Sequence, residues 1–464
     1  MSREMQRRQL STALLLGLAL IWHQSAGAAA VSDASAALSA SASHEIVQLL
    51  AGELERHYVD PDTAKKLGKV LRAKDRSGAY HSIITPPEFA QALNRDLAAV
   101  AHDPHLRVNY VPGPPPKDEQ VSPTEHIPAA LADTLRDLNG MIPKVQVLEG
   151  NVGYIRVDGL APLSISRAPI AAAFAFLRNS TALIVDCRSN TGGDPETVGF
   201  IVSYLSGGSS YVINSVSDRA GRAVREYRTT NLGALSFGPT KPVFVLTSPI
   251  TFSAGEMLAY DLQAFGRASI VGEVTAGGGN GGGTAFKLGH DLFALIPEVR
   301  ILNPVTRSSW EGIGVKPDES VSAAAALIRA HQLAIERLLL TAVNPARRAI
   351  LEAVDAKLQV LTEARSGGPQ LRIDQLTGTY TLVDGTFPGG GAASGPTVTI
   401  AERNGALVQE IEGVGEAMLI RVSGNRFIPQ GSPDGNYTSF LIKNGRLQMV
   451  MEDPPGPPAL RIKR

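Results

Sequence analysis

The sequence lacks the features of a disulfide framework, a nucleic-acid interface or a multi-span membrane protein. Its single cysteine, Cys187, excludes an intramolecular disulfide and any cysteine-based metal site. Lys and Arg together number 44, and so do Asp and Glu, so the formal net charge is zero. This balance argues against a nucleic-acid-binding protein, because such proteins normally carry a basic excess. After the first thirty residues, no stretch is apolar enough to span a bilayer.

The first thirty residues predict export. Three arginines within the first eight residues precede an apolar run over residues 10–22, and Ala26-Gly27-Ala28 follows. This order is typical of a secretory signal peptide, here residues 1–28. The run is shorter than the roughly 20 residues of a comfortable membrane span, and the alternative is an uncleaved amphipathic anchor. We therefore expect a periplasmic or extracellular protein with no stable membrane span after signal cleavage.

The 464 residues predict several domains, since a domain usually has about 150 residues. Apolar residues at helical spacing predict a helical N-terminal domain over 44–112, and a proline-rich start predicts a linker over 113–143. Strands alternate with helices over 144–330, which predicts an α/β layer domain. Residues 331–366 predict a helical connector with a break near Asn344-Pro345. Short strands separated by turn residues predict a β-sandwich or barrel over 371–464.

Three loops of the α/β region follow predicted buried strands and are candidates for the functional site. In open α/β sheets, ligands bind beyond the carboxyl ends of the strands, so these loops should meet at one crevice. The first contains Gly192-Gly193, where a helix begins. Paired glycines there let backbone N–H groups point into the crevice, as an oxyanion hole requires. The alternative is a plain strand-to-helix turn.

The second loop places Ser253 at the N-terminus of a predicted helix. Free N–H groups and the positive end of the helix dipole favour developing negative charge there, so Ser253 is a candidate nucleophile. It is equally a candidate N-cap, because Glu256 three residues later completes a capping box. The surrounding residues do not form the GxSxG elbow of α/β hydrolases.

The third loop, residues 275–283, is rich in glycine and includes Gly277 and Gly278. Such a loop can approach a bound chain closely, which makes these two glycines candidate substrate-binding residues, or it can be a flexible lip. A serine nucleophile also needs a base and an orienting acid. His105 and Glu311 are candidates, although each can equally be structural. His102 and His105 form HxxH without a third ligand, so no metal site and no cofactor are expected.

Five segments together resemble the S41 serine peptidases, the tail-specific or C-terminal processing protease superfamily. These segments are VLEGNVGYIRVDG, LIVDCRSNTGG, VFVLTSPITFSAGE, GRASIVGEVTAGG and WEGIGVKPD, in the order of the family. They look most similar to the branch of the interphotoreceptor retinoid-binding protein and the tricorn protease core. The resemblance implies a ClpP/crotonase-like layered α/β core.

The resemblance also implies a role for each candidate residue. Ser253 matches the nucleophile, His105 the tricorn-type general base, and Glu311 the acid that orients this base. The N–H of Ala254 and that of Gly192 or Gly193 would form the oxyanion hole.

The sequence departs from the Ser-Lys branch of the family in one segment. Where those proteases carry T-x-G-K, this chain has Thr275-Ala276-Gly277-Gly278, and Lys287 lies well beyond in a predicted strand. A Ser-Lys dyad is therefore disfavoured, and Lys287 is interpreted as structural. Residues 113–150 are also too few to hold a PDZ domain, the module that usually selects C-terminal tails.

We therefore predict an exported serine endopeptidase that acts on polypeptides through a Ser-His-Glu arrangement and a backbone oxyanion hole. One alternative is a non-catalytic protein that binds apolar, retinoid-like or fatty-acid-like ligands on the same fold. Another is an esterase that uses the same serine.

Overall fold

The structure is a computed structural model that describes residues 37–112, 127–208, 210–281, 283–365, 370–382, 397–403, 405–430, 437–443, 446–452 and 459–463. The predicted signal peptide and the first part of the predicted linker lie outside these residues. So does the glycine-rich segment 387–396 of the β module.

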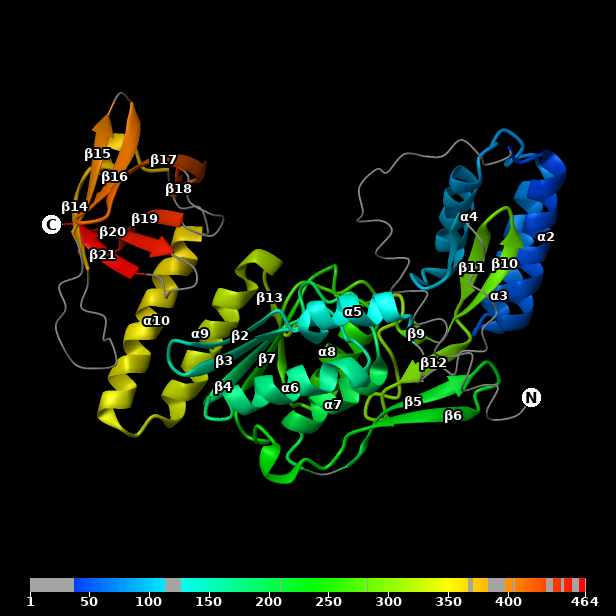
Figure 1. The fold of residues 1–464 in the computed structure, drawn as a ribbon, viewed down its shortest axis with the longest axis horizontal. Helices are drawn as coiled ribbons and strands as arrows, with labels where there is room; N and C mark the ends of the chain where they lie inside the picture. The colour runs from blue at the N-terminus through cyan, green and yellow to red at the C-terminus, as the bar shows by residue number, and fades with distance from the viewer. Residues whose placement is uncertain are drawn as a thin grey trace.

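A six-stranded sheet forms the centre of the molecule, with the order β13-β8-β7-β4-β3-β2 (Figure 1). All of its strands are parallel except β2, which pairs antiparallel with β3. The bounds are β2 Lys144–Leu148, β3 Val152–Arg156, β4 Ala182–Asp186, β7 Val243–Thr247, β8 Ser269–Gly272 and β13 Glu319–Ser320. Every residue of β4 and β7 is buried, as expected of strands covered on both faces. The predicted α/β layer domain is confirmed.

Helices cover both faces of this sheet. On one face, α6 (Leu163–Leu177), α7 (Pro195–Leu205) and α8 (Ala254–Ala264) pack against the alternate side chains of β3, β4 and β7. On the other face lie α9 (Ala323–Thr341) and α10 (Pro345–Arg365). The break predicted near Asn344-Pro345 is present. The predicted connector 331–366 is instead the second helical layer, because α9 and α10 bury apolar side chains on the sheet.

The N-terminal domain differs from its predicted boundary. Helices α2 (Ala40–His57), α3 (Pro61–Arg76) and α4 (Pro86–Ala101) precede strand β1 (Arg107–Tyr110). β1 pairs with β11 (Leu292–Ile296), which pairs with β10 (Thr284–Gly289). This hairpin lies among the N-terminal helices in Figure 1 and shares their apolar core. The domain therefore does not close at residue 112, because its core requires side chains from a hairpin almost 200 residues later.

Shorter elements connect these parts. Helix α5 (Ala129–Asp137) and a 3-10 turn at Asn139–Met141 occupy the predicted linker 113–143. A four-stranded sheet has the order β6-β5-β12-β9. Its strands are β5 Val212–Asp218, β6 Ala223–Arg228, β9 Asn280–Gly281 and β12 Val299–Leu302. A further 3-10 turn spans Gly233–Leu235.

The C-terminal module is a closed barrel of strands β14 to β21, preceded by the short helix α11 (Ile373–Leu376). The strands are β14 Gly378–Leu382, β15 Val398–Arg403, β16 Ala406–Ile411, β17 Gly415–Ser423, β18 Arg426–Pro429, β19 Tyr437–Lys443, β20 Arg446–Glu452 and β21 Ala459–Lys463. Tyr380 and Phe440 are fully buried in its interior. The all-β prediction is therefore confirmed, and of the two predicted architectures, sandwich or barrel, the module has the barrel.

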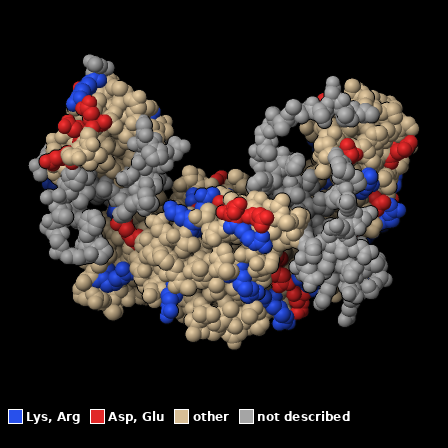
Figure 2. Space-filling view, in the orientation of Figure 1, with Lys and Arg blue, Asp and Glu red and all other residues tan. Residues whose placement is uncertain are grey.

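Within the described ranges, no helix has both the length and the apolar character needed to cross a membrane. Figure 2 shows acidic and basic side chains mixed over the visible face rather than gathered by sign, in keeping with the zero net charge.

Candidate active site

Ser253 occupies a sharp turn between the end of β7 and the start of α8. Its backbone has φ 54° and ψ −123°, a conformation that residues other than glycine rarely adopt. An ordinary N-cap residue has an extended backbone, so the backbone of Ser253 is not that of a simple cap. Strain of this kind persists only where surrounding contacts enforce it, and it is concentrated at functional sites.

The Ser253 hydroxyl meets the imidazole of His105, which is 148 residues earlier in the chain. Ser253 Oγ lies 3.0 Å from His105 Nε2, a hydrogen-bonding distance. His105 sits between α4 and β1, so the N-terminal domain supplies it, whereas the central sheet supplies Ser253. The ring of Phe252 packs on the imidazole with 4.5 Å between ring centroids. The structure thus brings together two residues that the sequence had only suggested as partners.

Asp103 fixes the position of His105 through its backbone. Asp103 Oδ1 accepts a hydrogen bond from the His105 N–H at 2.9 Å. Its Oδ2 accepts from the Tyr58 hydroxyl and from Asn280 Nδ2, each at 3.0 Å. Sequence reasoning missed these three residues. The one available signal was the Asp-x-His spacing, because an aspartate often bonds the backbone N–H two residues later.

Burial keeps His105 neutral at physiological pH. Burial lowers the pKa of His105 from 6.5 to about 4, against an opposing effect of the Asp103 carboxylate. A neutral imidazole can accept a proton at Nε2, which a general base must do.

Glu311 is bonded to Asn280, which also bonds to Asp103, but it makes no hydrogen bond to His105 among the described residues. Its Oε2 accepts from the N–H groups of Gly279 and Asn280, at 2.6 and 2.5 Å. Among the described residues, Glu311 Oε1 and His105 Nδ1 are both buried without a hydrogen-bond partner. Burial first, then the Asp103 charge, raises the pKa of Glu311 to about 8. The carboxyl group of Glu311 is therefore largely protonated at neutral pH. The predicted hydrogen bond between Glu311 and the His105 imidazole is not present in this structure.

The two glycines proposed for the oxyanion hole are not equivalent. Gly192 N–H already donates to Asn190 Oδ1 at 2.8 Å. Within the part of the chain that the structure describes, the N–H groups of Gly193 and Ala254 have no hydrogen-bond partner. Gly193 has φ 137°, and a Cβ there would lie 2.2 Å from the Leu160 carbonyl oxygen. The Gly193 backbone lies so close to the Leu160 carbonyl group that only glycine fits at this position.

The glycine-rich loop is anchored at its first residues rather than being a free lip. The buried Glu256 carboxylate accepts hydrogen bonds from the N–H groups of Gly277 and Gly278, at 2.7 and 2.8 Å. It also accepts from the Ser253 N–H at 2.9 Å and from the Thr275 hydroxyl. Sequence reasoning had given Glu256 only the role of a capping residue. The side chain in fact ties the serine turn to the loop that carries the two candidate substrate-binding glycines.

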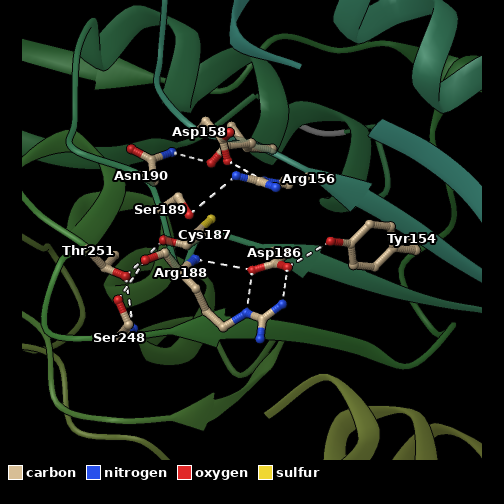
Figure 3. A network of polar contacts seen from close by, with 11 residues as sticks. Tyr154, Arg156, Asp158, Asp186, Cys187, Arg188, Ser189, Asn190, Ser248 and Thr251 are labelled. Carbon is tan, nitrogen blue, oxygen red and sulfur yellow. Dashed lines mark hydrogen bonds and ion pairs between the residues drawn. The ribbon is translucent and has the colours of Figure 1, made fainter. Parts of the chain in front are cut away.

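Hydrogen bonds also tie the first and second loops together (Figure 3). Ser248 Oγ donates to the Arg188 carbonyl oxygen at 2.6 Å, and Thr251 Oγ1 donates to that of Cys187 at 2.8 Å. The Phe252 N–H donates to the Asn190 carbonyl oxygen at 3.0 Å. The glycine pair and the serine turn are therefore held in one rigid unit.

Lys287, interpreted as structural, is exposed on β10.

Within the described ranges, no group of three or more His, Cys, Asp and Glu side chains is arranged to hold a metal ion. The candidate site brings together a hydroxyl, a neutral imidazole, unpaired backbone N–H groups and a buried carboxyl group.

Comparison with solved structures returns several proteases. The photosystem II D1 C-terminal processing protease matches with 17% identity and a TM-score of 0.39, over 61% of this chain and 94% of its own. A putative peptidase from Parabacteroides merdae matches with 15% identity and a TM-score of 0.41, over 61% and 90%. The tricorn protease matches with 13% identity and a TM-score of 0.37, over 68% and 37%.

Comparison with protein families gives two adjacent matches. Residues 151–321 match the model of peptidase family S41. Residues 29–149 match the N-terminal domain of Peptidase_S41 in eukaryotic IRBP, the interphotoreceptor retinoid-binding protein. The two matches together span more than half of the chain, and their boundary falls between β2 and β3 of the central sheet. The chain belongs to peptidase family S41.

Proposed function

We propose that this S41 peptidase is an exported serine endopeptidase with Ser253 as its nucleophile. The single observation that carries the proposal is the 3.0 Å contact between Ser253 Oγ and His105 Nε2. It joins a hydroxyl on a strained turn to a neutral imidazole, which is the arrangement needed to activate a serine. The same turn presents the unpaired N–H of Ala254.

The proposed reaction proceeds by acyl transfer. Ser253 Oγ attacks the carbonyl carbon of a peptide bond, and its proton passes to His105 Nε2. The N–H groups of Gly193 and Ala254 bind the resulting oxyanion. The imidazolium then protonates the leaving amine nitrogen as the C–N bond breaks. A water molecule, deprotonated by the same imidazole, hydrolyses the ester and regenerates the serine.

Glu311 is proposed to act when the imidazole becomes charged. A positive imidazolium favours the ionised form of a nearby carboxyl group, because opposite charges attract strongly in a buried site. We propose that Glu311 then releases its proton to solvent, and that its Oε1, unpartnered at rest, accepts a hydrogen bond from His105 Nδ1–H. Catalytic hydrogen bonds often tighten only once substrate is bound. The carboxylate would stabilise the charged base and hold its orientation.

The test is to replace the hydroxyl alone. We expect Ser253→Ala to abolish hydrolysis of casein and labelling by a fluorophosphonate, with unchanged thermal unfolding. Ser77→Ala, at an exposed serine after α3, is the matched control and should behave as wild type. Labelling of Ser253→Ala at the wild-type rate would refute the assignment of the nucleophile.

The same assays separate the two alternatives. An apolar-ligand carrier would leave casein intact, and it does not need the contact between Ser253 and His105. An esterase would turn over chromogenic esters while leaving peptide substrates intact. An endopeptidase should cleave internal bonds of unfolded protein, and mass spectrometry of the products identifies those bonds.

Export rests on the basic, apolar and small-residue order of residues 1–28. We propose that cleavage follows Ala28, so that the secreted or periplasmic protein begins near residue 29. N-terminal sequencing of the protein from the exported fraction tests this, and a chain that retains Met1 in the cytoplasm would contradict it.

A further inference from the structure

A cavity of about 510 Å³ opens at the carboxyl edge of the central sheet, near the start of α9. Its lining includes Tyr154, Arg156, Asp186 and Arg188. Their neighbours Ile155, Val185 and Cys187 point to the opposite face and pack in the core beneath α6 to α8. Since side chains alternate across a strand, the cavity lies on the α9 face of the sheet. The helix that begins directly after Ser253 covers the other face.

The one carboxylate in the cavity lining has no acceptor capacity left for a ligand. Asp186 is 3% exposed, and its Oδ1 accepts from the N–H and Nε of Arg188. Its Oδ2 accepts from Arg188 Nη2 and from the Tyr154 hydroxyl, at 2.6 and 2.7 Å. Figure 3 shows both partners converging on this carboxylate. The polar groups that remain for a ligand are therefore chiefly donors.

Arg156 is the most available of these donors. Its Nε donates to Asp158 Oδ1 at 2.7 Å, and its Nη2 lies 3.5 Å from Ser189 Oγ (Figure 3). No hydrogen bond of its Nη1 is found among the described residues, and the side chain is 43% exposed. A guanidinium whose Nη2 makes only this long contact and whose Nη1 has no partner among the described residues is suited to bidentate binding of a planar carboxylate. The exposed Ser189 hydroxyl can add a third donor.

The other residues that line the cavity indicate which kind of anion it fits. Two guanidinium groups face two carboxylates here, counting Asp158, so a single added negative charge fits better than a polyanion such as a nucleotide. Pro249, Ile250, Ala323 and Ala324 supply an apolar wall. Ile250 is 61% exposed, although it is a large aliphatic side chain. This combination fits a carboxylate joined to an apolar group.

We propose that this cavity binds a monocarboxylate with an apolar substituent, its carboxylate on Arg156 and Ser189 and its apolar part on Ile250. Two sources have this chemistry: a free N-acylated or otherwise neutral amino acid, and the C-terminal residue of a peptide. The site is distinct from the proposed hydrolytic machinery, because none of its ligand contacts is Ser253, His105 or Glu311.

The test measures binding by calorimetry to the Ser253→Ala protein, which should not degrade peptide ligands. The probes are N-acetyl-leucine, N-acetyl-leucinamide, and one peptide ending in leucine as the free acid and as the amide. We expect a free acid to bind and its amide to bind at least about tenfold more weakly, because the amide lacks the charge that Arg156 recognises. Binding of both free acids points to the amino-acid end group alone, and binding of only the peptide acid points to a peptide C-terminus.

Variants locate the site. Arg156→Gln should weaken binding of the free acid about tenfold, whereas Arg178→Gln, at an exposed arginine after α6, should leave it unchanged. The acid and amide comparison uses an unchanged cavity, so it remains decisive if Arg156→Gln proves unstable. Equal binding of acid and amide, binding unaffected by Arg156→Gln, or no binding at millimolar ligand would each overturn the proposal.

Discussion

At the scale of single residues, the candidate base is held by partners that touch no substrate in the proposed reaction. Asp103 fixes the His105 backbone and is itself held by Tyr58 and Asn280. Asn280 also donates its backbone N–H to Glu311, so one residue contacts both the positioning aspartate and the candidate acid. We interpret Asp103 as a positioning residue for the imidazole.

Asp103→Asn should lower kcat on the order of a hundredfold while changing KM little, because a small displacement of a reacting group costs about that much. The amide has one acceptor oxygen where the carboxylate has two, so it cannot accept from the His105 N–H as well as from Tyr58 and Asn280, and the turn should shift. Steady-state kinetics on a peptide substrate measure the effect. Asp62→Asn, at an exposed aspartate of α3, is the control. A fall in thermal stability with unchanged kcat would show that Asp103 is merely structural.

The pKa shifts at the site also predict stability. The pKa of Glu311 is raised from 4.5 to about 8, so between these values the folded protein binds a proton that the unfolded chain lacks. The free energy of unfolding should therefore fall as pH rises from about 4.5 to 8. Glu311→Gln removes this dependence, so its melting temperature relative to wild type should increase over that range. A constant difference from pH 4.5 to 8 would contradict the shift.

His105 has the opposite dependence. Its pKa is lowered from 6.5 to about 4, so between these values the unfolded chain binds the extra proton and stability falls as pH falls. His105→Gln should lose less stability than wild type when the pH drops from 6.5 to 4. Thermal melts of the two proteins over this range measure the difference, and parallel curves would contradict the prediction.

At the scale of elements, the sequence predicted more about the strands and helices than about their contacts. The buried strands β4 and β7, the helix after Ser253 and the break before Pro345 follow from local patterns of apolar residues and turns. The pairing of β1 with β11 does not, because it joins segments nearly 200 residues apart. The part that Glu256 plays in anchoring the glycine loop was equally out of reach, and so was the difference between Gly192 and Gly193, since each depends on which N–H groups the folded loops present.

Glu256 gives the prediction at this scale. Glu256→Gln keeps the size of the side chain but leaves buried N–H donors of the serine turn or the glycine loop without an acceptor. We expect a loss of about 1–3 kcal/mol in the free energy of unfolding. Urea titration measures it, and fluorophosphonate labelling should slow because the two loops are no longer tied. Glu88→Gln, at the corresponding position of α4 but exposed, should cost far less.

At the scale of the whole molecule, the candidate site is built by two of the three parts. The N-terminal domain supplies His105 and Asp103, and the central sheet and its loops supply Ser253, Gly193 and Glu311. In Figure 1 the barrel lies at the opposite end of the molecule, beyond α9 and α10. The barrel packs on α10 through β19, and its buried Val450 joins the apolar core that α9 and α10 form on the sheet.

A chain that stops after Arg365 should therefore still label at Ser253 as fast as the full chain. Its melting temperature should be lower, because the core around α10 loses its contact with Val450. Fluorophosphonate labelling and calorimetry of the two proteins test this. Loss of labelling in a truncated protein that still unfolds cooperatively would assign the barrel a direct part in the site.

The order of the strands has a consequence for synthesis on the ribosome. His105 and Ser253 have both been translated by residue 253. Within the described ranges, however, the strand that pairs with β1 is β11, which ends at Ile296. Glu311 comes later still. A nascent chain that ends before β11 therefore carries the candidate base and the candidate nucleophile on parts that are not yet joined. The proposed site can therefore assemble only after about two thirds of the 464 residues have been made, and shorter nascent chains should be inactive.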